Sequence, residues 1–338
     1  MTRELSTTGT AALERIGQAA NHAAARSVFV DYRSRKAPNT LRAQANALAA
    51  FRGFLASAGV QVDGLGMHPE AWRGVTWGLV EGFRNALVRQ GYAVGTVNGW
   101  LSTVKVYARL AAKAGALDRQ ELAMIASVEG YSRKDAQRVD DHRKAAGLPT
   151  RVGNKKPTAT PLSEGLCNAL RERPETPQGR RDAVIMALGL DLGLRVGELA
   201  ALTVDNVEGA ELYFFRSKVG KWQRHSLAVN GCLGVVKAYL ENDAPTEGPL
   251  LRSSVKGGRL DKPGMTTRAI SERVRSLGAE LGVNLSAHDL RHSWATRAKQ
   301  AGTQDTALTE AGGWASGAMV RRYGEAARIA NEGVRLAY

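Results

Sequence analysis

A short segment rich in proline and basic residues divides the chain into two halves. The sequence LPTRVGNKKPTATPLSEG, which begins at Leu148, holds three prolines, two glycines and three basic residues, and its first acidic residue is Glu164. Proline restricts the backbone and interrupts helices, so the segment favours an extended cationic linker over 148–161. A surface loop inside one domain is the alternative. A length of 338 residues suits two domains, each with its own hydrophobic core.

The first half has the hydrophobic pattern of helices. Apolar residues recur at helical spacing in 39–59, 77–91 and 96–115, and each of these segments ends at a glycine. The alternation of apolar and polar residues that is typical of a half-buried strand does not occur before residue 150. We therefore expect an all-α first domain.

The second half mixes helices with a small sheet. The segment 180–207 predicts two helices around a turn near Gly193, and ELYFFRSK followed by KWQRHSLAV predicts a β-hairpin. The fold class that we expect is a multidomain protein, with an N-terminal helical bundle and a mainly α C-terminal domain that carries a small antiparallel β-sheet. The expected parts are an N-terminal tail at 1–25, a helical domain at 26–147, the linker, a second domain at 162–323, and a C-terminal helix or tail at 324–338.

The charge balance points to a polyanionic partner. The chain has 47 basic and 32 acidic residues, a formal net charge of +15 and a pI of about 10.1. Both halves contribute, because 1–150 carries 20 basic against 12 acidic residues and 151–338 carries 27 against 20. Such a field attracts nucleic acid above all. An anionic membrane surface is less favoured, since no run of 18 apolar residues or basic amphipathic helix occurs. A basic composition that serves only solubility is the other alternative.

The cysteines and the N-terminal sequence indicate a cytoplasmic protein. Cys167 and Cys232 are the two cysteines, and they offer no disulfide framework. The N-terminal sequence lacks the apolar core of a secretory signal. We expect the protein in a reducing compartment, associated with DNA.

The stretch AHDLRHSWAT at 287–296 poses a choice between a metal site and an anion site. His288 and His292 have the spacing of the zinc signature H-E-x-x-H. Arg291 between them opposes a metal charge, Asp289 replaces the glutamate, and the other histidines offer no clear third ligand. We therefore expect His288 and Arg291 to bind an anion, and His292 to be a second-shell or core histidine. Neither a metal nor another cofactor is expected.

Four further residues complete a candidate phosphate site. Arg195 follows an apolar helix and a glycine turn, and its planar guanidinium suits bidentate binding of phosphate. Glu198 would hold that guanidinium in place or form a simple surface ion pair. Trp314 follows two glycines and offers an indole N–H donor, although a buried structural tryptophan fits equally well. Tyr323 follows two arginines, and it would be a nucleophile or a packing residue.

The order of these residues resembles the tyrosine recombinase (phage integrase) family, and most closely its simple Cre-like members. The most specific part is HDLRH, then GGW, then a tyrosine. The resemblance is strong over about 157–323 and looser over the first half, where 39–59 and 95–115 look like helices of the core-site-binding domain. RRYGEA lacks the Tyr-x-His ending common in Xer recombinases.

The resemblance implies a role for each member of the site. Arg195 and Arg291 would clamp the non-bridging oxygens of a scissile phosphate, and His288 would support that phosphate and assist proton transfer. Trp314 would take a position that is histidine in many integrases. Tyr323 would attack the phosphorus and form a 3′-phosphotyrosine.

A hairpin lysine and an acidic residue complete the set that the resemblance implies. Lys218 matches the family's general acid in the β-hairpin, and Lys221 lies close enough to remain an alternative. Glu198 matches the acidic residue that orients the active site. The rate enhancement would come from preplaced donors around the phosphate rather than from Mg²⁺.

The resemblance also implies partners and an assembly. Double-stranded DNA with inverted-repeat recombination sites would be the substrate, bound by a homotetramer that passes through a Holliday junction, with a monomer in solution. The candidate DNA contacts outside the catalytic set are Arg42, Lys105, Arg151, Lys155, Lys156 and Lys221. Three alternatives stay open: a type IB topoisomerase-like enzyme, a telomere-resolving enzyme, and an inert DNA-binding architectural protein.

Overall fold

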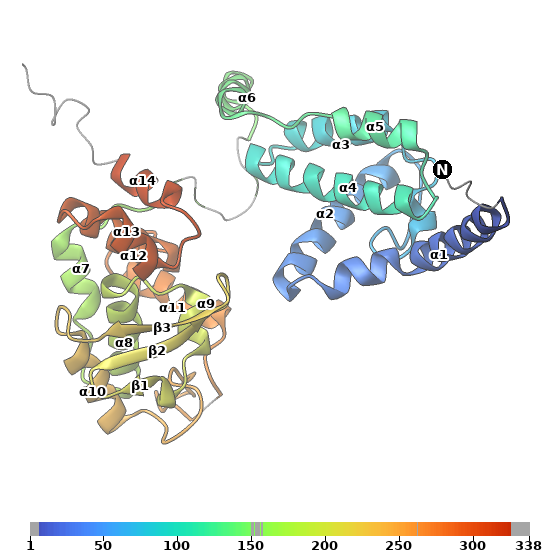
Figure 1. The fold of residues 1–338 in the computed structure, drawn as a ribbon. Helices are drawn as coiled ribbons and strands as arrows, with labels where there is room; N and C mark the ends of the chain where they lie inside the picture. The colour runs from blue at the N-terminus through green and yellow to red at the C-terminus, as the bar shows by residue number, and fades with distance from the viewer. Residues whose placement is uncertain (1–6, 150–151, 153–155, 157, 262, 326–338) are drawn as a thin grey trace, which may run out of the picture. The chain divides into compact units, whose positions relative to one another are not determined.

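The fold is known from a computed structural model, which describes residues 7–149, 152, 156, 158–261 and 263–325. The chain forms two compact units, Met1–Lys155 and Lys156–Tyr338 (Figure 1). The division lies inside the segment that we predicted as a linker. Each unit is described by itself.

The first unit is helical throughout its described part. Its central helix α4 contacts α1, α2, α3 and α5 (Figure 1). An aromatic cluster fills the core. Phe51 meets Phe83 edge-on at 5.1 Å between ring centroids, and Trp72 stacks on Tyr107 at 6.5 Å. The helices predicted from periodicity are confirmed as α2, α3 and α4. The elements are α1 (Thr7–Ser34), α2 (Pro38–Ser57), η1 (Pro69–Trp72), α3 (Trp77–Arg89), α4 (Val94–Lys113), α5 (Arg119–Ser127) and α6 (Arg133–Ala145).

Helix α1 corrects the prediction of an N-terminal tail. Residues 7–25, which we assigned to the tail, are helical and continuous with the rest of α1. Alanine dominates this stretch and has the highest helix propensity, whereas the apolar periodicity that we used to find helices is weak there. Only the last part of α1 enters the core, through Val28 and Phe29. Local propensity rather than burial therefore accounts for most of this helix.

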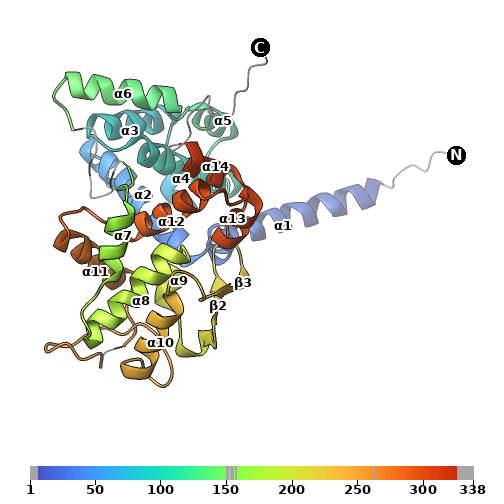
Figure 2. The same ribbon diagram turned by 90° about the vertical axis from the view of Figure 1, so that its left-hand side faces the viewer.

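The second unit surrounds the buried helix α8. Residues 184–188 of α8 are all buried, and α8 contacts α10 and α12, which lie on either side of it in Figure 2. The elements are α7 (Glu164–Arg171), α8 (Pro177–Asp191), α9 (Val196–Ala201), η2 (Val204–Asn206), β1 (Val207–Glu208), β2 (Glu211–Arg216), β3 (Lys221–Ser226), α10 (Cys232–Asn242), α11 (Thr267–Glu280), α12 (Ala287–Gln300), α13 (Asp305–Gly312) and α14 (Ala318–Glu325).

The predicted hairpin is present as strands β2 and β3 of an antiparallel sheet with the order β1-β2-β3. Side chains along β2 alternate, so that Leu212, Phe214 and Arg216 are buried while Tyr213 and Phe215 are exposed. The buried face of the hairpin therefore ends in an arginine. The two-residue strand β1 was not predicted. Of the predicted C-terminal part at 324–338, residues 326–338 lie outside the described residues.

The chain on each side of the division is tied to its own unit. In the first unit, the Val152 N–H donates to the Gly91 carbonyl at 3.0 Å. In the second, the Lys156 ammonium lies 2.6 Å from the Asp289 carboxylate, which also accepts from the Thr160 N–H at 3.1 Å. Burial alone raises the pKa of Asp289, but the hydrogen bonds from Lys156 and Ser286 outweigh it and hold this pKa below its usual value.

Replacing Asp289 should destabilise the second unit strongly. Asp289→Ala removes the carboxylate that pairs with the partly buried Lys156 ammonium and accepts from the Thr160 and Ser286 N–H groups and the Ser286 hydroxyl. Breaking a buried ion pair costs about 3–5 kcal/mol. We expect a large fall in the urea midpoint of unfolding. Asp261→Ala, which removes an exposed ion pair with Arg259, should change the free energy of unfolding by less than about 0.5 kcal/mol. Equal effects of the two substitutions would contradict this role of Asp289.

Candidate active site

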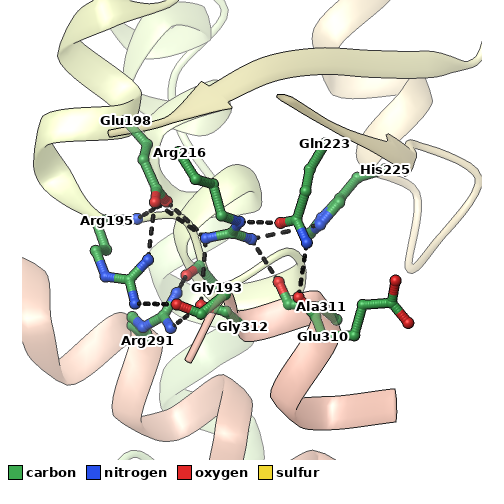
Figure 3. A network of polar contacts seen from close by, with 11 residues as sticks. Gly193, Arg195, Glu198, Arg216, Gln223, His225, Arg291, Glu310, Ala311 and Gly312 are labelled. Carbon is green, nitrogen blue, oxygen red and sulfur yellow. Dashed lines mark hydrogen bonds and ion pairs between the residues drawn. The ribbon is translucent and has the colours of Figure 1, made fainter. Parts of the chain in front are cut away.

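Arg195 and Glu198 are fixed together at the start of α9. The backbone N–H of Arg195 donates to one Glu198 oxygen at 2.8 Å, and its Nη1 donates to the other at 2.9 Å (Figure 3). The preceding turn requires Gly193, whose φ is +62° and where a Cβ would lie 2.2 Å from the ring of Trp294. The glycine thus lets the chain leave α8 and present Arg195 at this place.

Arg216, at the end of β2, also binds Glu198. Its side chain is fully buried, and its Nη1 donates to both oxygens of Glu198 at 3.0 Å (Figure 3). Its Nε donates to the Oε1 of Gln223, and its Nη2 lies 3.4 Å from His225 Nε2. Sequence reasoning did not select Arg216. The signal that would have found it is the alternation along β2, which places it on the same face as Leu212 and Phe214.

Arg291 enters the same cluster from α12. It is buried, its Nη1 donates to the Gly193 carbonyl at 2.5 Å, and its guanidinium lies 4.4 Å from the ring centroid of Trp314. Burial, followed by the positive charges of Arg195 and Arg216, lowers the pKa of Arg291 to about 9. The group still stays protonated at neutral pH. Arg195, Arg216 and Arg291 with Glu198 are called the arginine cluster below.

The C-terminal end of α13 binds all three arginines. The four consecutive carbonyls of residues 310–313 accept hydrogen bonds from the cluster and from Gln223 (Figure 3). Gln223 Nε2 donates to the Glu310 carbonyl at 2.8 Å, and Arg195 donates to the Gly313 carbonyl at 3.0 Å. Arg216 donates to the carbonyls of Ala311 and Gly312, and Arg291 donates to that of Gly312. The carbonyls at a helix C-terminus carry partial negative charge, which stabilises these cations.

Trp314 and Tyr323 lie against the cluster. Trp314 follows the glycine turn directly, and its ring centroid is 5.4 Å from that of Tyr323 in α14. Tyr323 is only 4% exposed, and the ring of His292 meets it edge-on at 5.0 Å. The structure therefore brings Arg195, Glu198, Arg291, Trp314 and Tyr323 to one place.

Three predicted site residues lie at the surface. Lys218 and Lys221 are exposed at the tip of the hairpin, and within the described part of the chain neither makes a hydrogen bond to the arginine cluster. His288 is exposed in the first turn of α12, three residues before Arg291. Their roles stay predictions.

The other predicted DNA contacts have different surroundings. Arg42 is exposed on α2. Lys105 is half-buried and donates to the Ala126 carbonyl at 2.9 Å, and Lys156 is paired with Asp289, so both of these cations already have intramolecular partners. Arg151 and Lys155 lie outside the described residues.

The cluster is chemically an anion site. It combines three guanidinium groups with one carboxylate, so it has an excess of positive charge. Among the residues that the structure describes, no group of three or more His, Cys, Asp or Glu side chains is arranged to hold a metal ion. The same part of the chain has no helix with the length and apolar character needed to cross a membrane.

Comparison with known proteins places this site in a family. A model of the phage integrase family matches residues 151–328, more than half of the chain. The chain belongs to the phage integrase family. It is therefore a tyrosine recombinase, an enzyme of site-specific DNA recombination. The further likeness to simple Cre-like members stays a prediction.

Relatives and solved structures agree with the family. The tyrosine recombinase XerD of Pseudomonas aeruginosa is 27% identical over 281 residues, which make up 77% of this chain and 77% of that protein. A lambda integrase dimer bound to a COC′ core site has the same fold, with a TM-score of 0.63 and 15% identity over 93% of this chain and 96% of that one. A lambda integrase tetramer bound to a Holliday junction gives a TM-score of 0.59 and 16% identity over 95% and 87%.

His225 should make the folded protein sensitive to mild acid. Burial and then the positive charge of Arg216 lower the pKa of His225 to about 4, against 6.5 in the unfolded chain. Between these values the unfolded chain binds a proton that the folded one does not, so stability is lost as the pH falls from about 6.5 to about 4. His225→Gln should flatten the pH dependence of the unfolding free energy by up to about 3 kcal/mol. His22→Gln, at an exposed position on α1, should leave it unchanged.

Proposed function

We propose that Tyr323 is the nucleophile of this recombinase and forms a 3′-phosphotyrosine with one DNA strand. Its Oη attacks the phosphorus, and the bond to the 5′-oxygen breaks. The observation that carries the proposal is the row of contacts from Tyr323 to Trp314 and from Trp314 to Arg291. This row supports the proposal because it would bring the Tyr323 hydroxyl close to donors for a phosphate. The phosphotyrosine conserves the energy of the phosphodiester, so strands are rejoined without ATP.

The arginine cluster would stabilise the charge that develops on the non-bridging oxygens. Donors that are already in place cost no reorganisation during the reaction, and in a buried site their effect exceeds that in water. Arg195 and Arg291 would bind the oxygens, Trp314 would donate from its indole, and Glu198 would hold Arg195. His288 would support the phosphate from the first turn of α12. This donor set accounts for charge stabilisation in a reaction that we expect to proceed without a divalent metal.

The leaving 5′-oxygen needs a proton. Lys218, at the tip of the β2–β3 hairpin, is the proposed general acid, and Lys221 is the alternative. Because both are exposed, DNA would have to bring the scissile phosphate to the hairpin tip.

The proposed substrate is duplex DNA carrying inverted-repeat recombination sites. Both units of the chain are basic, so we propose that the first unit serves as a core-site-binding domain and that both units contact the duplex. Lambda integrase forms a tetramer on a Holliday junction, and we propose the same assembly for this chain. A monomer in solution would then assemble on DNA.

A covalent-trapping experiment tests the proposed nucleophile. The protein is mixed with a library of nicked duplexes in EDTA, denatured in SDS and examined for protein-linked DNA. We expect an EDTA-resistant adduct that is absent with Tyr323→Phe and present with Tyr213→Phe, which removes an exposed hydroxyl on β2. Sequencing the linked DNA identifies the target.

The outcomes of this experiment separate the alternatives. Tight DNA binding with no adduct from any variant would support an inert architectural protein. Adduct formation with relaxation of supercoils but no strand exchange between two sites would support a topoisomerase-like enzyme. Loss of the adduct in EDTA would contradict metal-independent chemistry.

Removing Arg291 should slow cleavage without abolishing DNA binding. Loss of one preplaced donor typically costs about 10²–10³ in rate. We therefore expect Arg291→Ala to reduce single-turnover cleavage of the recovered target by this factor. Arg268→Ala, at an exposed ion pair on α11, is the matched control and should cleave at the normal rate. An unchanged cleavage rate for Arg291→Ala would contradict the proposed role of Arg291 in binding the phosphate.

A further inference from the structure

Arg216 has no part in the proposed chemistry, although it is the most deeply placed of the three arginines. Arg195 keeps part of its side chain accessible, whereas the side chain of Arg216 is fully buried. The Nε, Nη1 and Nη2 of Arg216 all donate to acceptors inside the protein, so its guanidinium is not placed to bind a DNA phosphate. Arg291 is also buried, but it lies against Trp314, in the row of contacts that leads to Tyr323. The function of Arg216 must therefore be exerted through the residues that it contacts.

Burying this charge is costly, and its hydrogen bonds join three separate elements. The guanidinium binds Glu198 of α9, the Ala311 and Gly312 carbonyls at the end of α13, and Gln223 on the neighbouring strand β3 (Figure 3). Replacement of both partners of a buried ion pair by well-packed apolar residues is often neutral for stability or even stabilising. Stability alone therefore gives weak reason for an arginine here. The planar fork of donors, by contrast, fixes the geometry of all three elements at once.

The backbone of Arg216 holds the turn that carries Lys218. The N–H groups of Val219 and Gly220 both donate to the Arg216 carbonyl, at 3.1 and 2.8 Å. Arg216 also stands opposite Lys221 in the strand register. The side chain of Arg216 is thus anchored in the core, while its main chain anchors the hairpin tip with both candidate general acids.

The same side chain reaches the turn that carries Trp314. Its acceptors, Ala311 and Gly312, lie three and two positions before Trp314 in the chain. The approach is so close that a Cβ on Gly313, whose φ is +56°, would lie 2.4 Å from Arg216 Cδ. Gln223 adds a second connection, because it accepts from Arg216 and donates to the Glu310 carbonyl at 2.8 Å.

We propose that Arg216 is a positioning residue, which sets the hairpin lysine at a fixed place relative to the glycine turn and Glu198. This proposal rests on the proposed function, in which that lysine protonates the leaving oxygen. It holds for Lys218 and for Lys221, since both belong to the tip that Arg216 anchors. The expected consequence of losing Arg216 is a defect in leaving-group protonation rather than in phosphate binding.

Substitution of sulfur in the substrate tests this role. On the target recovered by covalent trapping, the bridging 5′-oxygen of the scissile phosphate is replaced by sulfur. Attack by Tyr323 then breaks a P–S bond, and a thiolate leaves without needing a proton because thiols have a pKa of about 8.5. General-acid catalysis contributes about 10²–10⁴ in rate, so a defect in it should appear with oxygen and disappear with sulfur.

The expected pattern separates Arg216 from the phosphate-binding arginines. Arg216→Met should lose about 10²-fold in single-turnover cleavage of the oxygen substrate and recover to within a few-fold of wild type on the sulfur substrate. Substitution of the acting lysine, Lys218→Ala or Lys221→Ala, should behave in the same way. Arg195→Ala should be slow on both substrates, since it lacks a phosphate donor. Arg224→Met, on the exposed face of β3, should keep the wild-type ratio of the two rates.

Each remaining outcome decides a separate point. Equal loss of Arg216→Met on both substrates, or no loss on either, would overturn the positioning role. If Arg216→Met does not fold, Gln223→Met takes its place, because Gln223 is half-buried and joins the same elements. Its sulfur rescue would support the proposal, and equal loss on both substrates would overturn it. Failure of the wild-type protein to form an adduct with either substrate would instead contradict the proposed function.

Discussion

The ion pairs of Glu198 are the interaction on which the site depends. This one buried carboxylate binds Arg195 on one side and Arg216 on the other, each at about hydrogen-bond distance. Three guanidinium groups crowded into a buried space would repel one another, and Glu198 reduces this repulsion because its carboxylate binds two of them. The carbonyls at the end of α13 supply further negative potential. The net charge of the cluster is still positive, and a bound phosphate would lower it.

Two glycine turns allow the cluster to form. Gly193 lies where α8 passes into α9, and Gly313 lies between α13 and Trp314; both have positive φ. At each position a side chain would occupy space already filled, by Trp294 at the first and by Arg216 at the second. The turns expose carbonyls that accept from Arg291 and Arg195. Main-chain geometry therefore orients Arg195 and Arg291 as much as any side chain does.

Much of this arrangement is readable from the sequence. Periodicity of 3.6 residues located α2, α3 and α4, and two segments rich in aromatic and β-branched residues around a short connection located the hairpin. Residue chemistry selected Arg195 and Arg291, because a guanidinium after a glycine turn or between two histidines is hard to explain as solvation. Residue chemistry also selected Trp314 and Tyr323 but left a packing role open for each, and the family resemblance favoured a role in the site. The structure brings both together with the arginines.

The rest depends on tertiary contacts that no local pattern encodes. Alternation along β2 indicates that Arg216 is buried, but its partners follow only from the packing of the hairpin against α9 and α13. Lys156 reads as a linker cation, yet it pairs with Asp289, 133 positions away. The alanine-rich start of α1 lacks an apolar stripe, so a method based on stripes misses it. Backbone carbonyls, which bind all three arginines, have no sequence signature at all.

The most direct test of the account is to identify the residue that becomes linked to DNA. After trapping on the recovered target, the protein is digested with trypsin and nuclease, and the modified peptide is sequenced by mass spectrometry. The account predicts a nucleotide attached through its 3′-phosphate to Tyr323. Attachment through a 5′-phosphate, or to any other residue, would contradict it.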